Sequence, residues 1–256
     1  MPRRASDPPV LALFLAAVPA AAQGPVEERF SERASSSILL VYDGRRLEPG
    51  VEGALLGALE RIYAELVEDL GSGPAEKVTV VVYAERDWRL ATRAPDWSGG
   101  LFDGKVRVPA QGLTGVTPAL LSVLKHEMTH AFVQRRTRGR APTWLHEGLA
   151  QVEEGKTSAA YAGALLEAWR ATHTFGLRSL ETSFRRFAGP EARSGYAVSL
   201  AAVEMLRDTR GPGEISHLLD RLGDGEDVED AMRETVRGDY ARIESDLADW
   251  LGSRSR

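Results

Sequence analysis

The 256-residue chain contains no cysteine. It therefore cannot form a disulfide framework, a thiolate zinc site or a lipid anchor attached to a cysteine at a cleavage point. Its 256 residues, 43% of them hydrophobic, are enough to bury one good hydrophobic core. Its stability must come from that core alone.

The chain also lacks a large excess of charge and a long apolar run. Its formal net charge of −5 gives no electrostatic reason to expect nucleic acid or an anionic membrane as a partner. No run approaches the roughly 18 apolar residues of a membrane-spanning helix. No internal repeat is apparent, and the only biased segment is the alanine-rich N-terminus.

The first 22 residues have the pattern of a cleavable signal peptide. Arg3 and Arg4 precede an apolar stretch at residues 10–17, and Ala20 and Ala22 supply small side chains for cleavage after Ala22. We therefore expect a periplasmic or secreted protein with no stable membrane insertion after cleavage, and an uncleaved anchor is the alternative. Residues 23–36 are polar and are expected to form a flexible linker.

The most informative segment is residues 126–130, with the sequence HEMTH. Residues four apart lie on one face of a helix, so His126 and His130 can offer two imidazole nitrogens to one metal ion. Thr117 and Pro118 precede the segment with the residue types of a helix start. Glu127 lies one residue round from the histidine face, where its carboxylate can reach a water at the metal. A pair of surface or core histidines is the alternative interpretation.

A second motif, WLHEGLA, follows at residues 144–150. The intervening residues are enough to end one helix and begin another, and Glu147 is then available as a third, anionic ligand. Two histidines and a carboxylate leave one position of tetrahedral zinc open to water, which is the arrangement of a catalytic site. Arg136 stands where the metzincin pattern requires a third histidine, and this excludes the metzincin class.

Together the two motifs resemble those of the gluzincin metallopeptidases, and most closely the bacterial peptidase MA-like group related to the aminopeptidase catalytic domain. The similarity covers roughly residues 37–252 and includes residues 97–109 ahead of the histidine helix and a later helix at residues 196–206. The resemblance implies a zinc cofactor and assigns Glu147 as the third zinc ligand. The aminopeptidase motif G-x-M-E-N does not occur ahead of the histidine helix, so aminopeptidase specificity is not implied.

The expected fold class is α+β and zincin-like, with a small mixed α/β N-terminal lobe and a mainly helical C-terminal lobe. The residue patterns predict strands at residues 37–42 and 78–83, a helix from Val51 that ends at Gly71, and a hairpin around Asp103 and Gly104. From about residue 117 onward helical periodicity replaces the strand pattern. We predict a single peptidase domain over residues 37–252, with the α/β lobe at 37–110 and the helical lobe at 111–252.

The second strand of the predicted hairpin is a candidate for substrate binding. Lys105, Val106, Arg107 and Val108 are expected to form a sheet edge at the cleft, to which an extended peptide or protein substrate adds through backbone hydrogen bonds. Pro109 fits a strand that finishes at an edge. A hairpin that merely covers the core is the alternative.

The chemistry of the motifs predicts two catalytic roles. Glu127 is expected to act as the general base that takes a proton from the attacking water and hands it to the leaving amine. In gluzincin relatives a tyrosine after the third ligand often donates a hydrogen bond to the oxyanion, and the resemblance implies Tyr196 for this role. A half-buried core tyrosine would show the same pattern, and Tyr161 and His173 are weaker candidates.

The remaining polar residues near the second motif are expected neither to bind the metal nor to take part directly in catalysis. His146 and Glu147 point about a quarter turn apart, so His146 is expected to line the cleft or bond a backbone group rather than to bind the metal. Gln151 is a candidate for orienting a ligand histidine. Glu153 and Glu154 are expected to be solvated charges at a helix end.

Three functions compete at this point: an exported zinc-dependent metallopeptidase, a catalytically silent gluzincin-like module with a metal-binding or regulatory role, and a helical domain with a coincidental motif. The complete set of His126, Glu127, His130 and Glu147 favours the metallopeptidase. The oligomeric state does not follow from the sequence.

Overall fold

The computed structural model describes residues 27–45, 47–92, 99–110, 114–172, 176–182, 184 and 189–255, so the predicted signal peptide lies outside the described residues. The strands are β1 (Ser31–Ala34), β2 (Ile38–Tyr42), β3 (Val78–Ala84), β4 (Leu101–Phe102) and β5 (Val106–Ala110). The α-helices are α1 (Val51–Leu70), α2 (Glu85–Thr92), α3 (Pro118–Arg136), α4 (Thr143–Glu153), α5 (Ala162–Thr172), α6 (Gly189–Arg210), α7 (Pro212–Asp224), α8 (Val228–Thr235) and α9 (Tyr240–Arg254). Short 3-10 helices lie at η1 (Glu27–Arg29), η2 (Ala159–Tyr161) and η3 (Leu177–Leu180).

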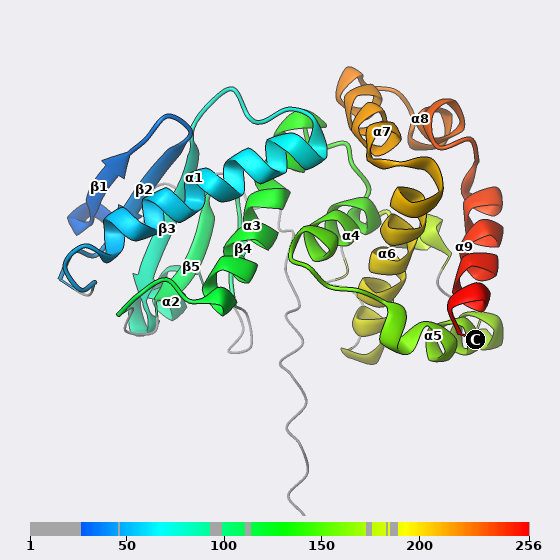
Figure 1. Ribbon diagram of the computed structural model, residues 1–256, viewed down its shortest axis with the longest axis horizontal. Helices are drawn as coiled ribbons and strands as arrows, with labels where there is room; N and C mark the ends of the chain where they lie inside the picture. The colour runs from blue at the N-terminus through cyan, green and yellow to red at the C-terminus, as the bar shows by residue number, and fades with distance from the viewer. Residues whose placement is uncertain are drawn as a thin grey trace, which may run out of the picture.

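The strands form one sheet in the order β1-β2-β3-β5-β4 (Figure 1). β2, β3 and β5 are parallel, whereas β1 pairs antiparallel with β2 and β4 pairs antiparallel with β5. Parallel neighbours need a long crossover, and α1 provides it between β2 and β3. As predicted, α1 ends at Gly71, whose positive φ of 92° suits the reversal of the chain there.

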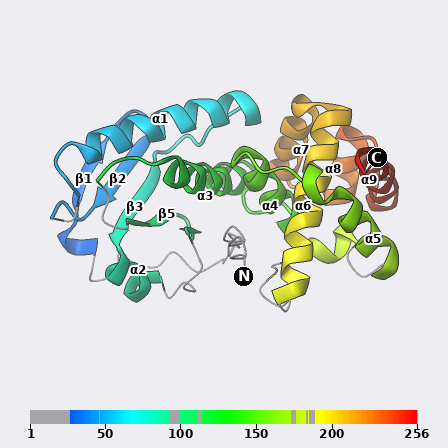
Figure 2. The ribbon, with the colours of Figure 1, turned by 60° about the horizontal axis from the view of Figure 1, so that its bottom comes forward.

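Alternating side chains divide the sheet into two packed faces. Val78, Val80 and Val82 of β3 belong to the main core with α1 and α3, whereas Val81 and Tyr83 belong to a second, smaller core on the opposite face. Figure 2 shows α1 and α3 on one side of the sheet and α2 on the other. The period of two explains why a run of valines can be buried on both sides.

The histidine helix begins where its sequence predicts. The side-chain oxygen of Thr117 accepts a hydrogen bond from the Leu120 backbone nitrogen at 3.2 Å, and Pro118 occupies the first turn of α3. The chain then turns through Gly139, at a φ of 75°, and enters α4 after Pro142. The motif residues of α3 and α4 are thereby placed at the junction of the sheet and the helical lobe (Figure 1).

The helical lobe is built around the contact between α4 and α6. A Cβ atom at Gly148 would lie 2.3 Å from the carbonyl oxygen of Ser199 and 2.4 Å from Val203 Cγ2, so a glycine is required at this crossing. Among the described residues after 110 there is no strand, which confirms the predicted α+β class with a mainly helical second lobe. No helix within the described part of the chain is both long and apolar enough to cross a membrane.

The predicted flexible linker at residues 23–36 is wrong from Glu27 onward. Residues Ser31 to Ala34 pair with β2 as the edge strand β1, and the side chain of Glu27 is buried beneath the sheet. The sequence looks like a linker because all four β1 residues are exposed and polar or small. Backbone pairing, the buried carboxylate of Glu27 and the packing of Phe30 against the second core fix this segment.

Candidate metal centre

Three buried side chains from two helices converge between the lobes. One turn of α3 separates His126 from His130, and their ring centroids are 4.9 Å apart. On α4, Glu147 Oε2 lies 3.9 Å from His126 Nε2 and 3.8 Å from His130 Nε2. Candidate ligand atoms of the three residues all lie within 4.8 Å of one another. The structure therefore brings together the predicted pair of histidines and the carboxylate.

The ligand atoms of this cluster are buried and unpaired. His126 Nε2, His130 Nε2 and Glu147 Oε2 have no hydrogen-bond partner among the residues that the structure describes. Buried polar atoms are nearly always paired in folded proteins, so three such atoms at one point indicate a ligand. Two imidazole nitrogens and one carboxylate oxygen form a donor set that catalytic zinc accepts, and the residues therefore fit a zinc ion.

Burial sets the protonation of the ligand residues. It lowers the pKa of His126, and it lowers that of His130 well below the ordinary value, with the charges of His126 and His146 adding to the effect. Both imidazoles are therefore held in the neutral form that binds metal. Burial raises the pKa of Glu147 well above the ordinary carboxyl value, and a cation at the cluster would favour its ionised form.

Glu127 lies beside the cluster and is not one of its members. It is completely buried, and neither of its carboxylate oxygens has a partner within the described part of the chain. Burial raises its pKa well above the ordinary value, and the charges of Glu147 and Glu154 raise it further. Gly100 packs directly against this side chain, since a Cβ atom there would lie 2.4 Å from Glu127 Oε1. No sequence pattern predicts this contact.

A second carboxylate, that of Glu154, contacts His126 at Nδ1, the ring nitrogen that does not face Glu147. Glu154 Oε2 lies 2.8 Å from His126 Nδ1 and 2.7 Å from Lys156 Nζ. Burial alone would raise the pKa of Glu154, but the hydrogen bond and charge of His126, with Lys156, lower it below the ordinary value. The prediction of solvated charges at this helix end is therefore wrong for Glu154, and also for the buried Glu153, which pairs with Arg207 at 3.0 Å.

A family comparison matches this arrangement. A sequence model described as the peptidase MA superfamily matches residues 58–253, well over half of the chain and both motifs. The chain belongs to the peptidase MA superfamily. The resemblance predicted from the two motifs is thereby confirmed.

Solved structures of zinc metallopeptidases are similar to this superfamily member at low sequence identity. The M1 zinc metallopeptidase from Deinococcus radiodurans is 21% identical with a TM-score of 0.49, and the match covers 88% of this chain and 52% of that one. A mutant of the Deinococcus radiodurans M1 enzyme bound to a Tyr-Ser-Ala substrate is 20% identical with a TM-score of 0.49, covering 87% of this chain and 51% of that one. The chain thus spans about half the length of these structures. No curated protein sequence matches it.

Within this peptidase MA domain, Gln151 and His146 do not contact a ligand histidine through hydrogen bonds. Gln151 Nε2 donates to the backbone oxygens of Glu147 at 3.1 Å and Tyr196 at 3.0 Å, so it supports the backbone of α4 and α6. The predicted role of Gln151 is therefore filled by Glu154. His146 is buried with its ring centroid 5.7 Å from that of His130, and burial lowers its pKa to about 3. As expected, His146 is not part of the ligand cluster.

Tyr196 lies on α6, the helix that packs against α4. Its ring is buried and meets the ring of Phe184 edge-on, with centroids 5.1 Å apart. Its role as the oxyanion donor stays a prediction. Of the weaker candidates, Tyr161 is 36% exposed, and His173 lies outside the described residues.

The predicted substrate strand is not the edge of the sheet. β5, which contains Val106, Arg107 and Val108, lies between β3 and β4, and these three side chains are buried. Lys105 belongs to the turn before β5. The edge is β4, a strand of two residues that is too short to recognise in the sequence. The hairpin itself, with Gly104 at a φ of 99°, is confirmed.

Proposed function

We propose that this member of the peptidase MA superfamily is an exported zinc-dependent metallopeptidase that hydrolyses peptide bonds with Glu127 as the general base. The observation that carries the proposal is the buried cluster of His126, His130 and Glu147 with an unpaired Glu127 carboxylate beside it. A silent metal-binding module would not need Glu127 in that position. A coincidental motif would not be expected to bring three unpaired ligand atoms together.

Metal binding, proton transfer and ligand orientation fall to different residues of the site. His126, His130 and Glu147 would hold zinc, which when bound supplies Lewis acidity toward a water and a peptide carbonyl. Glu127 takes a proton from the attacking water and returns it to the leaving nitrogen. Because burial raises the pKa of Glu127, this carboxylate accepts a proton more readily than an exposed one. Glu154 keeps the His126 ring oriented through Nδ1.

Two features favour an extended peptide or protein as the substrate. β4 is the last of the described strands on its side of the sheet, and an extended backbone can pair with such an edge strand without regard to its sequence. Gly100, immediately before β4, borders Glu127 and so places that edge next to the general base. We propose β4 in place of the inner strand β5 as the substrate edge, and Tyr196 as the hydrogen-bond donor to the oxyanion.

Metal content and hydrolysis together test the proposal. The mature chain from Gln23 should contain about one zinc per chain by elemental mass spectrometry, and Glu147→Ala should reduce this content. Glu127→Gln should keep its zinc and lower the hydrolysis of a quenched-fluorescent peptide library by about 10²- to 10⁴-fold. A folded wild-type chain that takes up no zinc after reconstitution would exclude the proposal. A Glu127→Gln variant that loses its zinc would show that Glu127 is a ligand instead.

Export is tested separately with the full chain. Expressed in a Gram-negative host, it should be recovered from the periplasm or medium with Gln23 as its first residue. Leu13→Arg, which interrupts the apolar stretch of the leader, should leave the protein in the cytoplasm with its full N-terminus. Recovery of the unprocessed wild-type chain in the membrane fraction would instead support an uncleaved anchor.

A further inference from the structure

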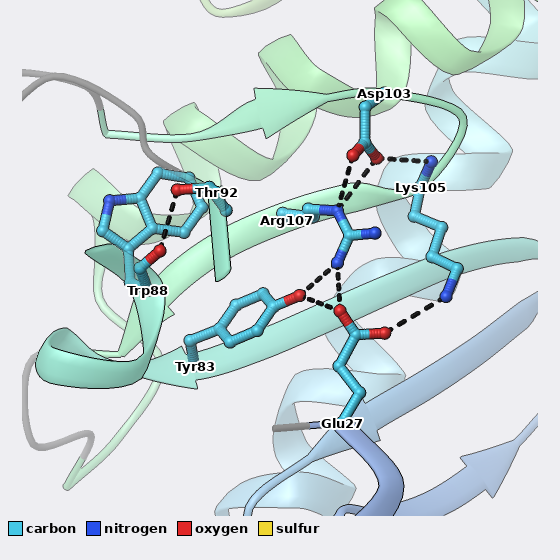
Figure 3. Close-up of polar contacts among 7 residues, drawn as sticks. All are labelled: Glu27, Tyr83, Trp88, Thr92, Asp103, Lys105 and Arg107. Carbon is cyan, nitrogen blue, oxygen red and sulfur yellow. Dashed lines mark hydrogen bonds and ion pairs between the residues drawn. The ribbon is translucent and has the colours of Figure 1, made fainter. Parts of the chain in front are cut away.

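A buried polar network joins Glu27, the first described residue, to the face of the sheet opposite α1 and α3 (Figure 3). The carboxylate of Glu27, only 2% exposed, accepts hydrogen bonds from Tyr83 Oη and from Arg107 Nη1. Its other oxygen lies 3.2 Å from Lys105 Nζ. One carboxylate of the N-terminal segment therefore contacts both β3 and the β4–β5 hairpin.

The network continues from Arg107 into the hairpin turn. Arg107 Nε lies 2.9 Å from Asp103 Oδ1 and 3.0 Å from Asp103 Oδ2, and the Arg107 side chain is only 5% exposed. Arg107 thus bridges Glu27 and Asp103, two carboxylates that are 76 positions apart along the chain. We call Glu27, Tyr83, Asp103, Lys105 and Arg107 the N-terminal clamp.

The hairpin that the clamp holds directly follows Gly100, which packs against Glu127. β4 pairs with β5 through Leu101 and Phe102 alone, so backbone hydrogen bonds fix it weakly. Phe102 packs into the main core beside α3, and Gly100 precedes β4 against Glu127. The position of this short strand therefore depends on the packing of its own side chains and on the side-chain contacts of the clamp that hold the adjoining turn.

We propose that Glu27 is a positioning residue for the peptidase site, which docks the N-terminal segment under the sheet and holds the β4–β5 hairpin beside Glu127. The inference rests on the proposed function for its effect on catalysis. The ordering of the hairpin by Glu27 does not depend on that function. The clamp would act on the substrate edge rather than on the zinc ligands, which lie on α3 and α4.

The test compares Glu27→Gln with Glu28→Gln, a matched control in the same 3-10 helix with an exposed side chain. In hydrogen–deuterium exchange, Glu27→Gln should accelerate exchange of the amides of residues 101–107 by about tenfold or more, while α9 stays at the wild-type rate. Zinc content should be unchanged. The KM for a peptide substrate should rise and kcat should fall in Glu27→Gln, whereas Glu28→Gln should match the wild type in every measurement.

A second control separates positioning from general loss of stability. Leu251→Ala, a core truncation in α9, should lower the melting temperature and leave hairpin exchange, KM and kcat unchanged. If Glu27→Gln does not fold, Lys105→Met removes one contact to Glu27 and should give a smaller acceleration in the same segment. Wild-type exchange at residues 101–107 in either variant, or acceleration spread evenly over the chain, would overturn the proposal. Loss of hydrolysis by the wild type would refute the proposed function without changing the exchange result.

Discussion

Replacing Gly100 with alanine tests whether Glu127 must hold one position. The added Cβ would lie 2.4 Å from Glu127 Oε1, 2.8 Å from Cγ and 2.9 Å from Cδ, whereas ordinary contacts begin at 3.4 Å. The two groups must therefore separate by about 1 Å. Both are buried, so neither can swing into solvent to relieve the overlap. The displacement falls on Glu127, the proposed general base, or on the proposed substrate edge next to it.

The expected loss follows from the size of this displacement. A misplacement of about 1 Å at a reacting group costs on the order of 10² in rate, and overpacking costs about 1–3 kcal/mol of stability. Gly100→Ala should therefore lower kcat/KM for a peptide by roughly 10² while zinc content stays at the wild-type level. Gly115→Ala is the control, because nothing lies within 4 Å of its Cβ position. Full activity in a folded, zinc-loaded Gly100→Ala variant would refute the reasoning.

Three other perturbations test the support around the site. Glu154→Gln removes the charge that holds His126, and the zinc dissociation constant should rise about 10- to 100-fold in a chelator competition titration. Gly148→Ala forces α4 away from the Ser199 carbonyl, and urea unfolding should show a loss of about 1–3 kcal/mol in the free energy of unfolding. Desolvation raises the pKa of Glu27, but its hydrogen bonds and the charge of its partners leave it below the ordinary value of 4.5. The stability that this carboxylate contributes is therefore complete above about pH 4.5 and is lost as the pH falls through the lower folded-state pKa. The stability difference between wild type and Glu27→Gln should narrow correspondingly on acidification.

Matched controls accompany these measurements. Glu167→Gln alters an exposed glutamate on α5 and should leave zinc affinity unchanged. Gly213→Ala adds a methyl group where nothing lies within 4 Å and should not destabilise the fold. Unchanged zinc affinity in Glu154→Gln would mean that the His126 ring needs no outside partner. An equal stability difference at pH 7 and pH 3 would contradict the assigned ionisation of Glu27.

The three residues of the candidate metal cluster were predictable because the relevant geometry is local. Helical spacing alone places His126 and His130 on one face, and the second helix start at Pro142 leaves Glu147 one turn inside α4. The capping signals at Thr117 and Pro118 correctly predict the first residue of α3. These features depend on residues near one another in the sequence.

The errors all involve contacts between distant segments. β1 carries no apolar pattern, and the burial of Glu27 depends on Arg107, 80 positions away. The inner position of β5 follows from β4, whose two residues give no recognisable strand signal. Glu154 shares a helical face with Glu147, which was visible in the sequence, but its contact with His126 depends on how α4 crosses α3.

The site depends on both lobes and on the contacts between them. The histidines and Glu127 lie on α3, which packs against the sheet, whereas Glu147 lies on α4, which packs closely against α6 at Gly148. A zinc ion held by all three ligands would therefore link the two lobes. The distance from Glu127 to the third ligand is set by the α3–α4 crossing, and its distance from the substrate edge is set by the β4–β5 hairpin. In the proposed reaction centre, Gly148 thus affects the position of the third ligand, and the N-terminal clamp affects the position of the substrate edge. Substitutions at the two places should therefore affect zinc affinity and substrate alignment independently.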